Sequence, residues 1–344
     1  MTRFALPLLA VACFASALPA DTPAVSSTTF TNPLKANGAD PCLFYHDGHY
    51  YLTVTTGRDV RLRRAARLGD LATAKDVVVW HDDDPKRNQA LWAPEFHLLD
   101  TPAGRRWFIY YTACDGREPN HRIYVCQSSG PDPMGPYEFK GQLKTDAADK
   151  HYAIDATILT QKNGRMYAVW CGRPSESGQG LYIAAMADPL TITGPRLYLK
   201  ADGFPKPGEK QPPVREGPEI LQHDGKTWLV YSSSSADTPD YKLGALVCAD
   251  DADPMKADSW TQHPTPLLVR NDAAGVYGPG HCFFFKSPDG TQDWIAYHAK
   301  TTKAVRYSDR ATFAQPVTWK PDGTPDFGVP QAAGTPIPVP AGEN

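Results

Sequence analysis

The sequence predicts an all-β protein that forms a five-bladed β-propeller in a single domain. Three observations support this prediction: a module that returns five times, 33 prolines and 27 glycines in 344 residues, and few long segments with helical periodicity. Each module consists of a polar residue, an apolar strand, a turn with glycine and an aromatic-rich strand. Without the first twenty residues, five equal units would have about 65 residues each, enough for a four-stranded blade with its loops.

The five modules are expected to be β-hairpins, at residues 40–52, 95–110, 155–170, 216–231 and 281–297. The polar residue that opens each module lies eight or nine positions before the turn glycine. This regular spacing predicts that the five opening residues occupy equivalent places in five blades. Because the inner strands of a propeller line its axis, these side chains should converge on one funnel. They are Asp40, Glu95, Asp155, Glu216 and His281.

The charge balance argues against a polyanionic partner. Lys and Arg number 35 and Asp and Glu number 38, which gives a net charge of −3. No basic field is therefore expected for nucleic acid or anionic lipid. Beyond the N-terminus no apolar run approaches the length of a membrane span.

Residues 1–20 have the pattern of a secretory signal peptide. A short basic start is followed by an apolar run from Phe4 to Ala20, which ends in small residues suited to cleavage. The mature protein is therefore expected to be secreted or periplasmic. Attachment of a lipid at Cys13 is an alternative, because the residues before it faintly resemble a lipoprotein signal.

The six cysteines after the signal are expected to be buried free thiols. They form no C-x-x-C pair, and most lie in apolar strand-like runs, so neither zinc nor a disulfide is indicated. They are Cys42, Cys114, Cys126, Cys171, Cys248 and Cys282.

Carboxylates gathered at one axis indicate chemistry. A single acid beside proline often just caps a turn, but four acids and a histidine in register favour a functional site. Without a P-loop, a G-x-S-x-G elbow, an H-E-x-x-H helix or an EF-hand loop, the options are a calcium site or an acid and base pair. Glycoside hydrolysis needs such a pair. Trp92, Tyr152 and Tyr277 lie beside the acids and would stack on a sugar ring, or pack between blades.

Five motifs, in order along the chain, resemble the signatures of glycoside hydrolase family 43, from about residue 30 to residue 335. Three further stretches, at residues 52–57, 238–244 and 314–316, resemble the exo-acting α-L-arabinofuranosidase group of that family. The five motifs are Gly38-Ala39-Asp40-Pro41 after Asn32-Pro33, Trp92-Ala93-Pro94-Glu95, Ala153-Ile154-Asp155-Ala156-Thr157, Arg215-Glu216-Gly217-Pro218 and Tyr277-Gly278-Pro279-Gly280-His281.

The resemblance implies one catalytic propeller, residues 30–335, that acts with inversion. It implies that Asp40 is the general base, Glu216 the general acid, and Asp155 a third carboxylate that orients the acid and raises its pKa. Glu219 competes for the role of the acid because it also follows a proline, but it is out of register with the other modules.

The resemblance also gives roles to two basic residues. His281 resembles an axial histidine that faces a metal ion or water, and the alternative is a hydrogen-bonded core histidine. No cofactor is expected to be required, although a structural calcium or other ion at the axis is compatible with this pattern. Arg310 resembles an arginine near the sugar, and the alternative is a surface residue.

The expected function is an exported exo-glycosidase that releases L-arabinose from arabinan or arabinoxylan. Its partners are arabinose-containing plant cell-wall polysaccharides and oligosaccharides. The insertion at residues 201–213 is placed to wall the mouth of the funnel. The alternatives are a β-xylosidase or endo-arabinanase on the same scaffold, and a non-catalytic glycan-binding propeller. Departures from the family pattern at Ala236-Asp237, Cys282 and Phe313 leave the exact glycan open.

Overall fold

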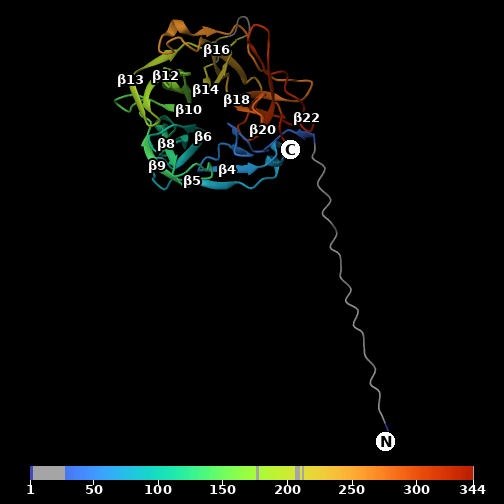
Figure 1. The fold of residues 1–344 in the computed structure, drawn as a ribbon. Coiled ribbons are helices and arrows are strands. Elements are labelled where there is room, and N and C mark those ends of the chain that lie inside the picture. Colours follow the sequence, from blue (N-terminus) through green and yellow to red (C-terminus); the bar gives the residue numbers. More distant parts are fainter. Residues whose placement is uncertain (3–27, 176–177, 206–209, 211–212, 344) are drawn as a thin grey trace.

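The computed structural model describes residues 1–2, 28–175, 178–205, 210 and 213–343. These residues form five four-stranded antiparallel sheets arranged as a ring, with one strand of each sheet at the central axis (Figure 1). The predicted five-bladed β-propeller is therefore confirmed. In each blade the strands follow chain order from the axis outward, so each blade is a meander of neighbouring segments.

The first three blades occupy residues 42–199. The first blade is β2 (Cys42–His46), β3 (His49–Thr53), β4 (Asp59–Ala65) and β5 (Val77–His81). The second is β6 (Gln89–Leu99), β7 (Arg106–Cys114), β8 (Arg122–Ser128) and β9 (Tyr137–Gln142). The third is β10 (Ala153–Thr160), β11 (Met166–Ser175), β12 (Gly178–Asp188) and β13 (Thr191–Leu199).

The last two blades and a terminal strand pair complete the ring. The fourth blade is β14 (Arg215–His223), β15 (Lys226–Ser233), β16 (Lys242–Ala249) and β17 (Thr261–Gln262). The fifth is β18 (Tyr277–Lys286), β19 (Asp293–Lys300), β20 (Arg310–Trp319) and β21 (Pro325–Asp326). Strand β1 (Thr29–Thr31) pairs with β22 (Pro336–Pro338). Short 3₁₀ turns occupy Leu68–Ala72, Glu118–Asn120 and Ala257–Ser259.

Hydrophobic side chains fill the seams between blades. Each of the five large clusters of buried residues joins two neighbouring blades, and the cluster at the seam of the fifth and first blades also contains residues that flank or belong to β1 and β22. At the first seam, Phe44 of β2 lies 4.6 Å from Trp107 of β7 between ring centroids. Adjacent blades are thus held by a shared core, which fixes the five inner strands around one axis.

Bulges in the inner strands decide which side chains reach the axis. The register of β10 shifts between Ile154 and Thr157, and that of β14 shifts between Glu216 and Glu219. Similar shifts interrupt β6 and β18. A bulge adds an unpaired residue and turns the chain, so it re-aims the side chains next to it.

A residue with positive φ near the start of each inner strand shows which positions are equivalent. Asp40, Asp155 and His281 have φ of 54°, 54° and 46°, while the matching residue in β14 is Gly217. Glu216 therefore lies one position before this point of its blade. The predicted equivalence of all five opening residues is wrong, because distance to the turn glycine does not reveal where a bulge lies.

Glu95 is the larger departure from the prediction. In β6 the bulge residue is Ala93, with φ of 41°, so Glu95 lies two positions further along the inner strand. Thr157 in β10 and Glu219 in β14 occupy the equivalent position, because strand pairing resumes at these residues after the bulge. These three residues form a separate layer of the axis.

The six cysteines after residue 27 are buried and free, as the sequence predicts. The predicted signal peptide, residues 1–20, lies almost entirely outside the described residues. Within the part of the chain that is described, no helix has the length and apolar character of a membrane-spanning helix.

The terminal strand pair is expected to stabilise the ring. Phe30 of β1 is buried opposite Ile337, and its ring lies 6.0 Å from that of Trp294 in the fifth blade. Phe30→Ala should lower the free energy of unfolding by about 3 kcal/mol, because truncating a buried phenylalanine removes apolar contacts and leaves a cavity. Denaturant unfolding measures this change. The exposed neighbour Thr31 provides the control, and equal unfolding midpoints for Phe30→Ala and Thr31→Ala would contradict the expectation.

Candidate active site

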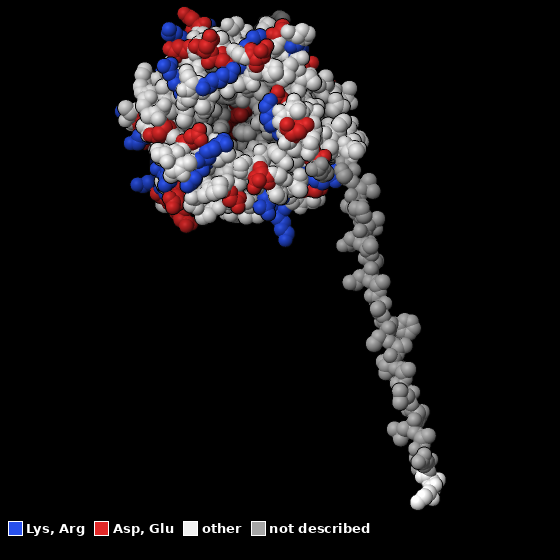
Figure 2. All heavy atoms as spheres, viewed as in Figure 1, with Lys and Arg blue, Asp and Glu red and all other residues white. Residues whose placement is uncertain are grey.

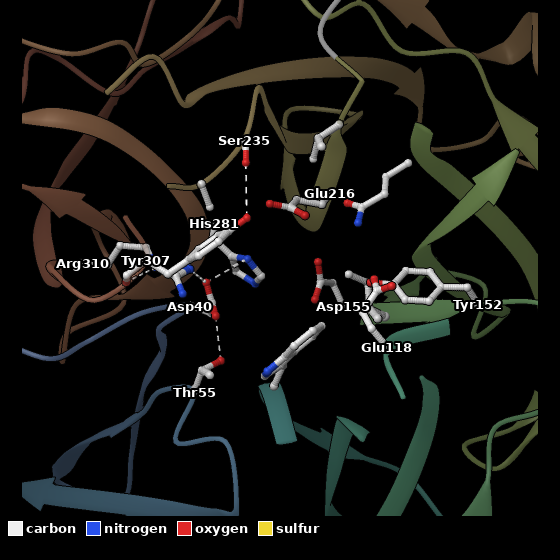
Figure 3. A pocket seen from close by; sticks show the side chains of 15 residues that line it. Asp40, Thr55, Glu118, Tyr152, Asp155, Glu216, Ser235, His281, Tyr307 and Arg310 are labelled. Atoms are coloured by element: carbon white, nitrogen blue, oxygen red, sulfur yellow. Dashed lines mark hydrogen bonds and ion pairs between the residues drawn. The ribbon is translucent and has the colours of Figure 1, made fainter. Parts of the chain in front are cut away.

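A pocket of about 480 Å³ opens at one mouth of the propeller axis. Figure 2 shows a hollow near the centre of this face with acidic atoms inside it, and Figure 3 shows the side chains that line the pocket. Its volume is in the range of protein sites for small molecules. The predicted site residues that line it are Asp40, Trp92, Tyr152, Asp155, Glu216, His281 and Arg310.

The negative charge of Asp40 is stabilised by an arginine and a hydroxyl group. Nη1 of Arg310 donates to its Oδ1 at 2.8 Å, and Oγ1 of Thr55 donates to its Oδ2 at 2.7 Å (Figure 3). The backbone N–H of Asp40 donates to Nδ1 of His298 at 3.2 Å. Burial raises the pKa of Asp40, but Arg310, together with His281 and His298, outweighs burial and holds the pKa well below its ordinary value. Asp40 is therefore ionised and rigidly held.

Asp155 is a buried carboxyl, and no cationic side chain among the described residues forms a hydrogen bond with it. Its Oδ2 accepts from the backbone N–H of Gly217 at 3.1 Å, and its own N–H donates to Thr112 at 3.2 Å. Burial and the negative charges of Glu216 and Asp40 raise its pKa well above the ordinary value. The bond to Gly217 ties Asp155 to the residue next to Glu216.

Glu216 has the opposite electrostatics to Asp40. The hydroxyl of Tyr241 donates to its Oε1 at 2.9 Å, and the Tyr241 ring lies parallel to that of His298, with centroids 5.3 Å apart. Burial raises the pKa of Glu216 to about 7, with a further increase from the charge of Asp40 and a decrease from the Tyr241 hydrogen bond. Glu216 thus holds a proton at a pH where Asp40 has lost its own. One pocket therefore contains a proton acceptor and a proton donor.

A second pair of carboxyls lies beneath the pocket and does not line it. Glu219 Oε2 accepts from the hydroxyl of Thr157 at 3.0 Å, and Glu95 Oε2 lies 2.9 Å from Nε2 of His97. Both glutamates are buried, and burial raises the pKa of each well above the ordinary value. Glu95 is therefore not part of the funnel surface, contrary to the prediction. Glu219 is likewise separated from the pocket that Glu216 lines.

Comparison with known proteins adds a family to this geometry. The sequence model of Glycosyl hydrolases family 43 matches residues 30–325. The chain belongs to this family. Its all-β propeller with carboxyl groups at the axis is thus that of a glycoside hydrolase.

Two relatives of the family 43 chain are arabinofuranosidases by name. The chain is 37% identical over 353 residues to an extracellular exo-α-(1→5)-L-arabinofuranosidase from Streptomyces avermitilis, covering 96% of this chain and 70% of the relative. It is 34% identical over 349 residues to α-L-arabinofuranosidase 43 from Humicola insolens, covering 95% and 67%. The crystal structure of α-L-arabinofuranosidase from Lactobacillus brevis has a TM-score of 0.80 and 33% identity, covering 89% of this chain and 98% of that one.

Aromatic side chains form one wall of the pocket. The ring of Trp92 stacks on His121 with centroids 4.0 Å apart, and the guanidinium of Arg173 lies 4.1 Å from the ring centroid of Tyr152. Both aromatic residues line the pocket, as the prediction of sugar-stacking residues requires. Tyr277 does not line it. It opens β18 before the first register shift of that strand, at the point that pairs with Lys300 of β19.

His281 lies against Asp40 rather than within a set of metal ligands. Its Nδ1 is 3.3 Å from Oδ1 of Asp40, and burial lowers the pKa of its imidazole. Among the described residues, no three His, Cys, Asp or Glu side chains are grouped so that they could hold a metal ion. The axial ion that the sequence left open therefore stays a prediction, and no chemical step is derived through one.

Several residues that line the pocket or contact its carboxyl groups were not predicted from the sequence. Thr55 and Tyr241 contact the two central carboxyls, and both lie in stretches that carried the family resemblance. The family resemblance of those two stretches could therefore have identified Thr55 and Tyr241. His298 and Glu118 had no such signal, because a histidine within an apolar strand and an acid in a polar loop are common in any protein.

The hydrogen bond from Tyr241 should set the pKa of Glu216. This bond stabilises the ionised carboxylate, so its removal in Tyr241→Phe should move the pKa of Glu216 above about 7. A ¹³C NMR titration of the glutamate carboxyl carbons measures this value, with Glu216→Gln to assign the resonance. Tyr277→Phe, outside the pocket, should leave the titration unchanged. A native Glu216 that titrates near 4.3, the value of an unperturbed glutamate, would contradict the assignment.

Proposed function

We propose that this chain is an inverting, exo-acting α-L-arabinofuranosidase. Its proposed substrates are arabinan and arabinoxylan, from which it releases L-arabinose at non-reducing α-L-arabinofuranosyl ends. Membership of Glycosyl hydrolases family 43 supports the reaction class, and the names of the relatives support the sugar.

The opposite electrostatics of Asp40 and Glu216 are the observation that carries the mechanism. Hydrolysis of a glycosidic bond needs an ionised carboxylate that activates water and a protonated carboxyl that assists the leaving oxygen. Arg310 stabilises the charged form of Asp40, while burial stabilises the neutral form of Glu216. A pocket that only bound a glycan would not need this division of protons.

In the proposed reaction Asp40 accepts a proton from water as the water attacks the anomeric carbon. Glu216 donates its proton to the glycosidic oxygen as the bond to the leaving chain breaks. Asp155 supports the donor, because its Oδ2 accepts from the N–H of Gly217 and so fixes the backbone next to Glu216. Attack by water on the face opposite the leaving group inverts the anomeric centre.

The shape of the axis supports attack at chain ends. The buried residues Glu95, Thr157 and Glu219 lie on the inner strands beyond the lining residues, so a sugar reaches Asp40 and Glu216 from the mouth. A pocket with a floor accepts a terminal residue more readily than the middle of a polymer. Val214, next to the predicted mouth insertion at residues 201–213, lines the pocket, whereas residues 206–209 and 211–212 of that insertion lie outside the described residues.

Export is part of the proposal. Relatives from Streptomyces avermitilis and Streptomyces chartreusis are named extracellular, and residues 1–20 have the sequence pattern of a signal peptide. Secretion would place the enzyme where cell-wall polysaccharides are found.

Substitution of the three proposed catalytic residues should nearly abolish hydrolysis. Asp40→Asn, Asp155→Asn and Glu216→Gln should each lower kcat by roughly 10²–10⁴-fold, the range attributed to general acid and base assistance. Glu219→Gln is the matched control, since it changes a buried carboxyl beneath the pocket and should have a smaller effect on kcat. Initial rates on arabino-oligosaccharides measure these losses. An inactive Glu219→Gln beside an active Glu216→Gln would exchange the roles of the two glutamates.

The leaving group provides a sharper test of Glu216. An activated aryl arabinofuranoside needs little protonation, so Glu216→Gln should retain more of its activity on the aryl substrate than on an oligosaccharide. Asp40→Asn should lose activity on both, because activation of water does not depend on the leaving group. Equal losses of Glu216→Gln on the two substrates would argue against its role as the acid.

The products should identify both the sugar and the mode of attack. Linear arabinan should yield arabinose from the earliest time points, and proton NMR should show the β anomer first if the α linkage is hydrolysed with inversion. Chromatography of the products over time completes the measurement. Early arabinotriose and longer oligomers would indicate an endo-arabinanase, and xylose as the main product from xylo-oligosaccharides would indicate a β-xylosidase. Initial release of the α anomer would overturn the inverting mechanism.

A further inference from the structure

Lys300 is a fully buried lysine beside the pocket. It is the last residue of β19, it pairs with Arg310 at the start of β20, and its relative exposure is 0%. Lysine is almost never buried completely unless its charge is paired, because removal of an ammonium group from water is costly. The surroundings of its nitrogen therefore need an explanation.

Carbonyl oxygens from two separate loops surround Nζ of Lys300. Nζ donates to the carbonyl oxygens of Asp237, Ala304 and Arg306, the last at 3.1 Å. The carboxylate of Asp309 lies 3.6 Å away. Three acceptors use all three N–H donors of an ammonium group, and a neutral amine has only two. The site is thus a cage of oxygens around a cation, as protein carbonyls also form around calcium.

The cage joins two loops that build one wall of the pocket. Residues 234–241 connect β15 to β16 and bring Ser235 and Ala236 to the pocket, while residues 301–309 connect β19 to β20 and bring Tyr307. The backbone N–H of Arg306 also donates to the carbonyl oxygen of Asp237 at 2.9 Å. In Figure 3, Ser235 and Tyr307 face each other across this junction, with their hydroxyls 3.4 Å apart.

Each of the two loops ends at a residue that holds a central carboxyl. The loop at 234–241 ends at Tyr241, which donates to Glu216, and the loop at 301–309 is followed by Arg310, which donates to Asp40. One buried cation therefore lies between the supports of both carboxyls. Its loss would remove a donor from each of three carbonyl oxygens and would weaken the contact between the loops.

We propose that Lys300 is a positioning residue whose ammonium group acts as a tethered cation, holding Arg310 on Asp40 and Tyr241 on Glu216. This inference rests on the proposed function for its activity measurements. It assigns no contact between Lys300 and the substrate. The charge and three-fold donor geometry of Lys300, rather than its bulk, are what the site requires.

The test removes the cation and supplies it again from solution. Lys300→Ala deletes three carbons and the nitrogen, which are the atoms of propylammonium. We expect Lys300→Ala to lower kcat/KM on an aryl arabinofuranoside at least tenfold and added propylammonium chloride to restore much of that loss with saturation. Potassium chloride and 1-propanol are the controls for ionic strength and for bulk. Lys300→Met keeps the length of the side chain without charge and should show a similar loss.

The matched control variant is Lys303→Met in the same loop. Lys303 is exposed, pairs with Asp272 at 2.9 Å and does not line the pocket, so kcat/KM should remain that of the native enzyme and should not respond to propylammonium. This comparison separates the buried cation from a general effect of lost positive charge in the loop.

The pH profile gives a readout that a purely structural role would not change. The groups that face Asp40 are Arg310, His281 and His298, with the carboxyls of Asp155 and Glu216 across the pocket. Because Arg310 lowers the pKa of Asp40, a displaced Arg310 raises it. The acidic limb of kcat/KM should therefore move to higher pH in Lys300→Ala and return with propylammonium.

The outcomes separate this inference from the proposed function. Native kinetics and an unchanged acidic limb in Lys300→Met would overturn the inference. If Lys300→Ala is recovered only as aggregates, refolding with propylammonium decides: recovery of activity supports the tethered cation, and recovery no better than with potassium chloride overturns it. Failure of the native protein to release arabinose would instead refute the proposed function.

Discussion

The pocket depends on one electrostatic constraint: buried carboxyl groups at a shared axis cannot all be ionised. Burial and mutual repulsion favour protonation of every one, and a cation reverses this preference only for its immediate neighbour. Arg310 lies on Asp40, so the negative charge resides there, while Glu216 and Asp155 have raised pKa values. The position of a single guanidinium thus divides chemically similar side chains into an acceptor and a donor of protons. Nε of Arg310 also donates to the carbonyl oxygen of Tyr307 at 3.1 Å, and this bond helps to orient the guanidinium.

The sequence predicted the number of blades and the three central carboxyls because both follow from repetition. Glycine turns and aromatic strands return at regular intervals, and the acids of Asp40, Asp155 and Glu216 stand in motifs at the start of inner strands. Inner strands must converge in a propeller, so placing residues on them was enough to bring these acids together. Trp92 and Tyr152 followed for the same reason. The family resemblance added Arg310, whose strand is the third of its blade and whose approach to the axis no repeat indicated.

Bulges and loops account for what the sequence did not predict. Counting back from a turn glycine assumes a regular strand, but the bulge at Ala93 places Glu95 one layer deeper, beside Glu219. Tyr277 lies before the register shifts of β18 and stays outside the pocket. The burial of Lys300 depends on two loops folding over it, and no local pattern distinguishes it from a lysine at an exposed strand end. Contacts between segments far apart in the chain are thus the part that pattern alone does not reveal.

The pairing of β1 with β22 has a consequence for biosynthesis. During synthesis the N-terminus of a protein leaves the ribosome first. Because each blade consists of consecutive strands, a blade can form as soon as its own residues have emerged. The seam between the fifth and first blades is different, because Trp294 and Ile337, which pack against Phe30, are made about 260 and 310 residues later. Until then this apolar edge of the first blade remains exposed on a nascent chain. Closure of the ring therefore requires the last residues of the chain, and we expect it to be a late event of folding.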